Sequence, residues 1–431
     1  MIDPTRHRSP SRRAAPLAGA LALLAITISL ALLASCSTEA NPSFCCSDPA
    51  DCSRFGVTDE KRECAAGLAC VGHTCVSTAC QSAADCDPSA PVCDGNACRA
   101  CRLDAECASG ACADDGTCVA ESAIVYLAPQ GVDVAPCSQA APCKELIFAV
   151  EQTTDTRDHI VLAPGTYQLK RDPFIGPAAT SATQLTVHGG GAILDLSTAD
   201  IDLQIALPTK LRDLYIVHPL GTGIYIYSDV VIEHSTIGAT FGITSRNHTT
   251  LRDVVIRATA TGISLAGGSL TIDGATISGG TSAIIDNDLS STGVEITNLL
   301  VYGTSDVALD LDSSTGSLKF VTIANSGTNS STASGLKCAF VDVRSTIIWT
   351  PNSLRPPIVG NCFRSSTIAG PVDVPGTMNI DPKFISIAAE NFRLAAGSPA
   401  RDLSDSGPPR DFENDPRPQG DRFDIGADES P

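Results

Sequence analysis

The chain has 431 residues, 4% of them aromatic, and carries 29 Lys and Arg against 48 Asp and Glu, which gives a formal net charge of −19 at pH 7. A surface this acidic repels phosphate backbones, so we expect no nucleic-acid partner. With one Trp and two Met, the core has to be built from Ile, Leu, Val and Ala, which suits narrow, stacked β architectures.

The first 35 residues have the pattern of a bacterial secretion signal, with four arginines before an apolar run from Leu17 to Leu33. The run ends in Leu33-Ala-Ser-Cys36, which resembles a lipobox. This resemblance implies that the chain is cut before Cys36 and that the Cys36 thiol carries a diacylglycerol. Ser37 in place of an aspartate resembles the sorting pattern of outer-membrane lipoproteins. We therefore expect a chain anchored in the outer membrane or at the cell surface through lipid; the alternatives are an uncleaved membrane helix and simple secretion.

The 18 cysteines that remain after Cys36 fall into even-numbered sets. Fourteen lie between Cys45 and Cys118, and the two further sets are Cys137 with Cys143 and Cys338 with Cys362. Even sets in an exported chain indicate disulfides, and we expect the two later sets to be local pairs. A zinc site is the rival interpretation, but the cysteine-rich region contains one histidine, His73.

Residues 45–119 form the expected disulfide-rich module, joined to Cys36 by a tether at 36–44. A four-cysteine unit recurs at 80–98 and 101–118, and segments this short and polar need cross-links in place of a core. The spacing resembles small Dickkopf-type or disintegrin-like cysteine modules. The connectivity of this module is left open by the sequence.

From Lys210 onward the chain repeats every 19 to 25 residues, with a first apolar anchor, a second one five residues later, and in six repeats a third. The first anchors are Leu211, Ile232, Leu251, Ile272, Ile296, Leu318 and Val343. The second are Ile216, Ile237, Ile256, Ile277, Val301, Ile323 and Ile348, and the third are Ile224, Ile243, Ile263, Ile284, Leu309 and Leu336. Three short segments per repeat indicate a solenoid. Abundant Ile, Val and Thr with Gly, Asn and Asp at the turns favour β-strands.

Two further stretches carry a resemblance to known families. Residues 126–131, the Cys137 and Cys143 pair, and residues 158–167 resemble the opening of bacterial pectate-lyase-like right-handed β-helix domains. Asp381-Pro-Lys-Phe384 and Asp424-Ile-Gly-Ala-Asp-Glu429 resemble the closing segment of the choice-of-anchor Q family, whose members are surface proteins held by varied anchors. The resemblance implies a fold and a location, because most members of both families have no assigned activity.

We therefore predict an all-β fold, a right-handed single-stranded parallel β-helix over residues 123–370, with the small disulfide-rich module before it. Apolar residues at helical spacing within 144–152 predict a short helix that closes its N-terminal end. Residues 371–431 are expected to form a C-terminal capping segment, and the chain is expected to be a monomer.

The densest group of carboxylates in the repeats consists of Asp286 and Asp288 on one coil and Asp310 and Asp312 on the next. Calcium prefers oxygen ligands of this kind, so any cation site of the β-helix is expected here. The pectate-lyase resemblance implies a calcium-assisted lyase with an Arg or Lys base. Arg246, the nearest basic residue on the same side, lies two coils away, and no lyase motif is matched. The alternative is a set of solvated corner residues.

A second column alternates in charge and predicts an outward-facing salt ladder. It consists of Arg212, Glu233, Arg252, Asp273, Thr297, Lys319 and Arg344. One interpretation is that this ladder forms a sugar-binding stripe. The simpler interpretation is that oppositely charged side chains on neighbouring strands pair with one another in contact with solvent. Among the histidines, His188 precedes three glycines and is expected to be structural, while His218 and His234 lie on adjacent coils at non-equivalent positions.

Two functions from different classes follow. The first is a surface protein whose β-helix presents an extended face for glycan or protein contact without catalysis. The second is a polysaccharide (uronate) lyase or hydrolase that acts along a groove of the helix. A basic residue in register with the acidic cluster would favour the second, and the sequence alone does not reveal one, so the catalytic residues stay unknown.

Overall fold

The computed structural model describes residues 68–71, 74–77, 80, 82–169, 173–198, 202–287, 293–329, 332–350 and 354–431. The chain divides into two compact units, Met1–Cys86 with Cys93–Cys98, and Asp87–Val92 with Arg99–Pro431. The signal segment, Cys36, the tether and Asp288 lie outside the described residues, so the predictions made for them stay predictions.

The cysteine-rich module is made of short hairpins and single turns held by disulfides. β1 (Leu68–Val71) pairs antiparallel with β2 (Thr74–Ser77), and β3 (Val92–Asp94) pairs with β4 (Ala97–Arg99). Short 3₁₀ turns lie at Ala83–Asp85 and Asp104–Glu106. In each four-cysteine unit the first cysteine joins the third and the second joins the fourth. The bonds are Cys80–Cys93, Cys86–Cys98, Cys101–Cys112 and Cys107–Cys118.

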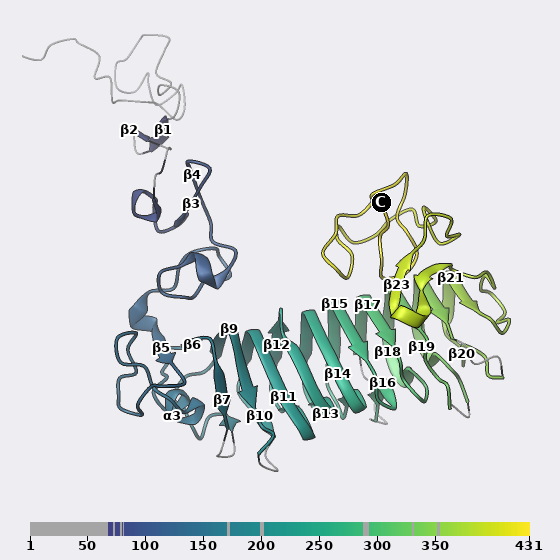
Figure 1. The fold of residues 1–431 in the computed structure, drawn as a ribbon, viewed down its shortest axis with the longest axis horizontal. Coiled ribbons are helices and arrows are strands. Elements are labelled where there is room, and N and C mark those ends of the chain that lie inside the picture. Colours follow the sequence, from purple (N-terminus) through teal and green to yellow (C-terminus); the bar gives the residue numbers. More distant parts are fainter. Residues whose placement is uncertain are drawn as a thin grey trace, which may run out of the picture. The chain divides into compact units, whose positions relative to one another are not determined.

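The β-helix is one continuous sheet of parallel strands wound into stacked coils, from β5 to β21 (Figure 1). Its first strands are β5 (Ile124–Leu127), β6 (His159–Leu162), β7 (Thr166–Gln168), β8 (Phe174–Ile175), β9 (Leu185–Asp195) and β10 (Leu203–Ile205). The middle strands are β11 (Thr209–Ile226), β12 (Val230–Glu233), β13 (Thr236–Ser245), β14 (Thr249–Leu265), β15 (Ser269–Ser278) and β16 (Ser282–Asp286). The last are β17 (Gly293–Tyr302), β18 (Leu309–Ala324), β19 (Leu336–Trp349), β20 (Ile358–Val359) and β21 (Phe363–Gly370).

The register predicted from the anchors is confirmed in every coil. Ile216 is aligned with Ile237, Ile237 with Ile256, and Ile256 with Ile277; the first and third anchors form two further rows. Every anchor is at most 1% exposed. Because burying one such side chain contributes roughly 1.5–3 kcal/mol, the three rows are the main source of the stability of the solenoid.

A sharp corner separates the first and second anchors of each coil. The residue two positions after the first anchor has a positive φ, a conformation that Asp, Asn and Gly tolerate better than most residues. These residues, which we call the corner column, are Asp213, His234, Asp253, Gly274, Asn298, Phe320, Ser345 and Ser366. The Asp or Asn in the sequence repeat suits this turn, although His, Phe and Ser adopt the same conformation in other coils.

Disulfides and a short helix accompany the coils. Cys137 is bonded to Cys143 next to β5, and Cys338 to Cys362 between the last coils. The helix α3 (Leu146–Glu151) lies where a helix was expected and contacts β5 and β8, with Leu146, Ala149 and Val150 buried. In the part of the chain that the structure describes, no helix is both long and apolar enough to span a membrane.

The C-terminal segment, residues 371–431, packs against the side of the later coils, near β15, β17 and β18 in Figure 1. It contains β22 (Phe384–Ser386), a 3₁₀ turn at Ile387–Ala389, and β23 (Asn391–Leu394). Its backbone N–H groups at Gly426 and Ala427 donate to Ser345 O and Thr322 Oγ1 at 2.9 Å. The C-terminal segment therefore covers the part of the corner column that lies on the last coils of the β-helix.

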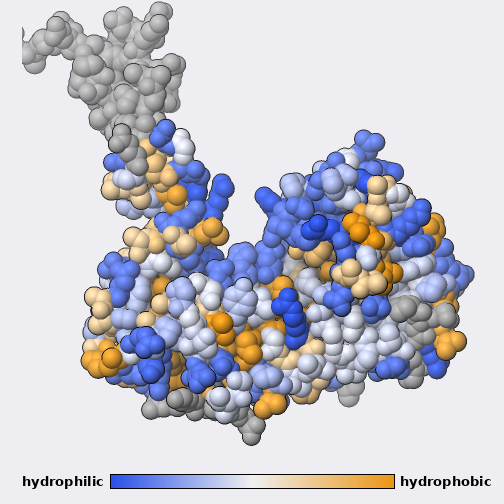
Figure 2. Space-filling model, viewed as in Figure 1, coloured by the Kyte–Doolittle hydropathy of each residue, from blue (hydrophilic) through white to orange (hydrophobic). Residues whose placement is uncertain are grey.

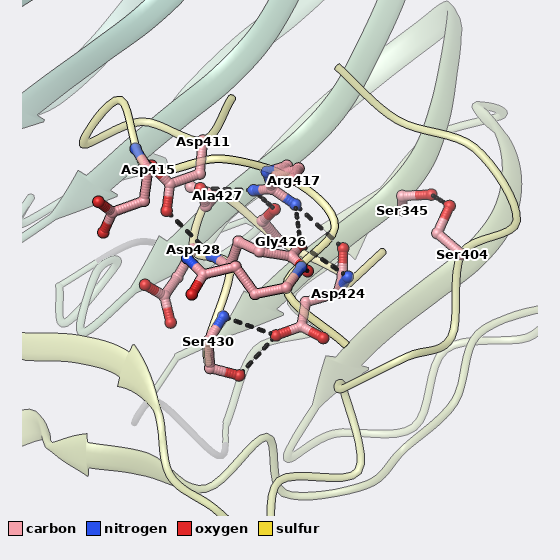
Figure 3. A network of polar contacts seen from close by, with 12 residues as sticks. Ser345, Ser404, Asp411, Asp415, Arg417, Asp424, Gly426, Ala427, Asp428 and Ser430 are labelled. Carbon is pink, nitrogen blue, oxygen red and sulfur yellow. Dashed lines mark hydrogen bonds and ion pairs between the residues drawn. The ribbon is translucent and has the colours of Figure 1, made fainter. Parts of the chain in front are cut away.

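A buried arginine holds this segment together (Figure 3). The Arg417 side chain is 0% exposed and donates to the backbone carbonyls of Asp424, Gly426 and Ala427 and to a Glu429 carboxylate oxygen at 3.2 Å. Its guanidinium carbon lies 4.9 Å from the centre of the Phe320 ring. A buried charge persists only when it is hydrogen-bonded and paired, so this network holds the segment together, and the contact with Phe320 places it against the β-helix.

Candidate functional site

A row of outward side chains runs along the third strands of successive coils. Side chains alternate along a strand, so the residue after each buried third anchor points away from the core. In chain order the row comprises Phe174, Gln204, Tyr225, Thr244, Ser264, Ile285, Asp310, Lys337 and Val359. All are partly exposed and neighbours are about 4.8 Å apart. We call this row the strip, and we include in it Tyr227, which stacks on Tyr225, and Arg246, which lies over Tyr227.

Aromatic and hydroxyl side chains dominate the N-terminal part of the strip. The rings of Tyr225 and Tyr227 are stacked, with centroids 6.2 Å apart and planes inclined by 13°. Tyr227 is 40% exposed, and the Arg246 guanidinium carbon lies 5.7 Å from its ring centre, within reach of a cation–π contact. Thr244 and Ser264 follow on the next two coils. This part offers flat apolar faces next to polar groups.

The C-terminal part of the strip carries an ion pair. Lys337 lies in register with Asp310, and its Nζ lies 3.4 Å from Asp310 Oδ1 and 3.1 Å from Asp312 Oδ2. Partial burial alone would lower the pKa of Lys337, but the hydrogen bond and charge of Asp312, together with Asp310, outweigh it and raise that pKa. Lys337 therefore stays protonated and balances the two carboxylates.

Among the described members of the predicted acidic cluster, Asp286, Asp310 and Asp312, the structure shows no common set of ligand atoms. Asp310 is aligned with Ile285 and not with Asp286, so the side chains of Asp286 and Asp310 leave their strands on opposite faces. Asp286 Oδ2 accepts a hydrogen bond from Ser314 Oγ at 2.6 Å. Within the described ranges, the groups of three or more close ligand atoms are cysteine sulfurs that are engaged in disulfides. The calcium site stays a prediction, since Asp288 is not described.

Sequence reasoning missed the basic residue in register with the acidic cluster. Lys337 directly follows the third anchor Leu336, as Asp310 follows Leu309, and this shared position was the available signal. Arg246, the basic residue considered from the sequence, belongs instead to the aromatic part of the strip, where it lies over Tyr227.

The salt ladder has the predicted register, but its environment differs from the expected open surface. Glu233 is only 6% exposed and accepts hydrogen bonds from Arg212 Nε at 2.9 Å and Arg252 Nη1 at 2.7 Å. Arg212 and Lys210 also contact Asp114 of the second four-cysteine unit, at 2.6 and 2.8 Å. Residues 99–118 therefore cover the N-terminal end of this column, which the repeat pattern alone does not reveal.

The three histidines that the sequence singles out each lie close to an aspartate. His188 is 1% exposed, and its Nδ1 lies 2.9 Å from Asp104 Oδ2. His218 is buried with Nε2 3.3 Å from Asp202 Oδ1. His234 lies at an exposed corner, where its hydrogen bond to Asp253 raises its pKa. His188 and His218 are therefore packed in the interior, and His234 belongs to the corner column.

No protein-family model and no curated protein matches the sequence. Among solved structures, the chain is similar to one titled crystal structure of pectate lyase Pel9A, with 12% identity and a TM-score of 0.41, over 72% of this chain and 100% of that one. It is also similar to a rhamnogalacturonan lyase, with 12% identity and a TM-score of 0.35, over 66% of this chain and 95% of that one. At this level of similarity, the assignment as a parallel β-helix rests on the strand pairing described above.

Proposed function

We propose that this chain binds a polysaccharide along the strip and does not cleave it. The observation that carries the proposal is the continuous outward row with stacked tyrosines and Arg246 at one end and a balanced ion pair at the other. Aromatic faces, hydroxyl groups and charged groups together match the apolar faces and hydroxyl groups of sugar rings. A repeat of about 4.8 Å along the row lets an extended chain make the same kind of contact on successive coils.

The chemistry of Lys337 argues against the lyase alternative. A lyase base has to accept a proton from its substrate, so it must be neutral at the working pH. Lys337 is the basic residue in register with Asp310, yet the raised pKa of its ammonium group favours the charged form. The lyase or hydrolase alternative therefore needs a base other than Lys337.

The proposed location follows from the first residues of the chain. A lipid on Cys36 would anchor the protein in the outer membrane or at the cell surface, with the disulfide-rich module between the lipid and the β-helix in sequence. On the face shown in Figure 2, hydrophilic residues gather over the outer part of the C-terminal segment beside a hydrophobic patch, and the β-helix carries hydrophilic, intermediate and hydrophobic residues.

The test is a binding assay on a panel of neutral, uronate and amino-sugar polysaccharides, with the chain from Ser37 onward. Tyr227→Ala removes an exposed ring from the strip, and we expect about tenfold weaker binding, equivalent to ~1.4 kcal/mol. The matched control is Tyr215→Ala, because Tyr215 is 51% exposed but lies beside a second anchor, outside the strip. Equal losses in both variants, or binding of proteins and no glycan, would overturn the proposal.

A further inference from the structure

A series of carboxylate and imidazole groups lies where the second four-cysteine unit meets the first coils of the β-helix. Asp104 Oδ2 lies 2.9 Å from His188 Nδ1, and His188 Nε2 lies 3.0 Å from His159 Nδ1. His159 Nε2 in turn lies 3.7 Å from Asp158 Oδ1. The groups come from a 3₁₀ turn, from β9, from β6 and from the residue before β6, and all belong to the larger compact unit.

This series is part of the docking of residues 99–118 on the β-helix. The side chains of His188 and Asp104 are buried, and that of His159 is 19% exposed. Asp104 also accepts a hydrogen bond from Cys112 N at 2.8 Å. Its carboxylate therefore contacts the backbone of the four-cysteine unit and a side chain of the β-helix at once.

The two imidazoles have room for a limited number of hydrogens. An ionised carboxylate only accepts, so the contact with Asp104 requires a hydrogen on His188 Nδ1. Of the two ring nitrogens that face each other, only one can carry a hydrogen, because two N–H groups 3.0 Å apart repel. The docked pair therefore accommodates one positive charge at most. A second proton would also place two charged rings with their centres 5.2 Å apart.

The surroundings make the pair hold its protons less tightly. Burial and the charge of His188 lower the pKa of His159 from 6.5, and Arg212 adds to this effect. The charges of Asp158 and Asp104 act in the opposite direction without outweighing it. The unfolded chain therefore binds this proton more tightly than the folded one. The contribution of His159 to stability is complete above pH 6.5 and is lost as the pH falls below that value.

The neighbouring carboxylates differ in how they respond to acid. Burial raises the pKa of Asp104, but the hydrogen bond and charge of His188 outweigh burial and lower that pKa overall. The hydrogen bond from Lys210 lowers the pKa of Asp114, so both aspartates stay ionised while the histidines titrate. Asp213 of the corner column also interacts with Asp104 and His188, and burial raises its pKa. Asp213 is therefore the neighbouring carboxylate that an experiment has to control for.

We propose that the docking of residues 99–118 is sensitive to pH: the residues stay docked at neutral pH and detach when a second proton enters the pair His159 and His188. Detachment uncovers the N-terminal end of the salt ladder, where Arg212 now contacts Asp114. Each proton taken up on detachment favours the detached state by up to about tenfold per pH unit. The pair shares no residue with the strip, so this inference is independent of the proposed function.

The experiment is hydroxyl-radical footprinting of the chain from Ser37 onward at pH 7 and pH 5. Tyr126 reports on docking, because it is 6% exposed, its hydroxyl group donates to Ser109 O at 3.2 Å, and it packs against Ala111 and Val119. Tyr167 is the internal control, since it is equally buried but belongs to the interior of the coils. We expect oxidation of Tyr126 to rise by about tenfold or more at pH 5, and oxidation of Tyr167 to stay unchanged.

Two variants identify the group that takes up the proton. His159→Asn replaces the ring with an amide that can donate or accept, so the contact with His188 survives in either protonation state. Tyr126 should therefore stay protected at pH 5 in this variant. Asp213→Asn is the matched control, because Asn tolerates the positive φ of the corner, and this variant should detach like the wild type.

Three results would overturn this proposal. One is equal oxidation of Tyr126 at pH 7 and pH 5 in the wild type. Another is a rise at pH 5 that persists in His159→Asn or is lost in Asp213→Asn, which would assign the proton to another group. The third is a parallel rise at Tyr167, which would indicate unfolding of the first coils. If His159→Asn fails to fold by circular dichroism, the comparison of the two tyrosines in the wild type decides alone.

Discussion

The ammonium nitrogen of Lys337 lies 3.1 Å from a carboxylate oxygen of Asp312 on the preceding coil. The same nitrogen lies 3.4 Å from Asp310, so one lysine occupies the space between two carboxylates where a cation would otherwise be held. Two carboxylates that both contact one lysine repel one another unless a positive group lies between them. Lys337 therefore supplies from within the chain the charge that calcium supplies in a metal site.

Replacing Lys337 with Met should create calcium dependence. The variant leaves Asp310 and Asp312 unbalanced, so a cation that binds only the folded state should raise its melting temperature. In the wild type, we expect millimolar calcium to shift the melting temperature much less. Differential scanning calorimetry with and without calcium measures this, with Lys319→Met, an exposed lysine on another strand, as the control. A large calcium shift in the wild type that the variant lacks would contradict this account.

The stacked isoleucines should dominate the stability of the solenoid. Ile256 is 0% exposed within the second-anchor row, and Ile256→Ala should cost about 2–5 kcal/mol through lost burial and a cavity. Arg257 is its neighbour on β14 and points outward, so Arg257→Ala should change the free energy of unfolding by less than about 0.5 kcal/mol. Urea denaturation of both variants checks the difference, and the reverse order would mean that the register is wrong.

The register was predictable because every coil has to place apolar side chains in the interior at the same positions of its strands. Ile237 and Ile256 both have to fill the interior on successive coils, so their spacing from the first anchors is fixed at five residues. Lys337 was harder to place, because insertions at the turns vary the distance between coils. If the position of each residue is counted from the third anchor of its own coil, Lys337 and Asp310 both fall one residue after that anchor and are aligned.

Contacts between the β-helix and its neighbours were not predictable from the repeat. Arg417 lies over Phe320, and Asp114 contacts Arg212 across 98 residues of sequence. Neither pair has a periodic signal, since each depends on how a non-repeating segment docks.

The C-terminal segment should respond to pH through Asp428. Burial raises the pKa of Asp428 to about 6, with the charges of Asp411 and Glu413 adding to the effect. The folded chain then holds this proton more tightly than the unfolded chain, whose carboxyl titrates near 3.8. The contribution of Asp428 to the free energy of unfolding should therefore fall as the pH rises from about 4 through 6.

Replacing Asp428 with Asn tests this directly. An amide oxygen can still accept the hydrogen bond from Leu394 N, which is 2.7 Å long, but it cannot ionise. We expect the variant to be more stable at pH 7 by roughly 1 to 3 kcal/mol and to lose part of the pH dependence between 4 and 6. Urea denaturation across this range measures it, with the exposed Asp421→Asn as control. An unchanged pH profile would exclude Asp428 as the group responsible.

The lipid anchor predicts a clear change in partitioning. Cys36→Ala removes the thiol that would carry the diacylglycerol, so the variant should leave the detergent phase in a Triton X-114 separation, whereas the wild type should stay in it. Cys338→Ala, which breaks the disulfide to Cys362, serves as a control for the loss of a cysteine elsewhere and should not alter partitioning. Membrane association that survives Cys36→Ala would point to an uncleaved helix at the N-terminus.

The most direct test of the central claim is hydroxyl-radical footprinting of the chain with the polysaccharide that it binds best. Tyrosine rings react readily, and both Tyr227 and Tyr215 are exposed, at 40% and 51%. If the strip is the binding surface, Tyr225 and Tyr227 lose reactivity when the polysaccharide is present and Tyr215 does not. Protection of Tyr215 with unchanged labelling of Tyr225 and Tyr227 would show that the polysaccharide lies elsewhere on the β-helix.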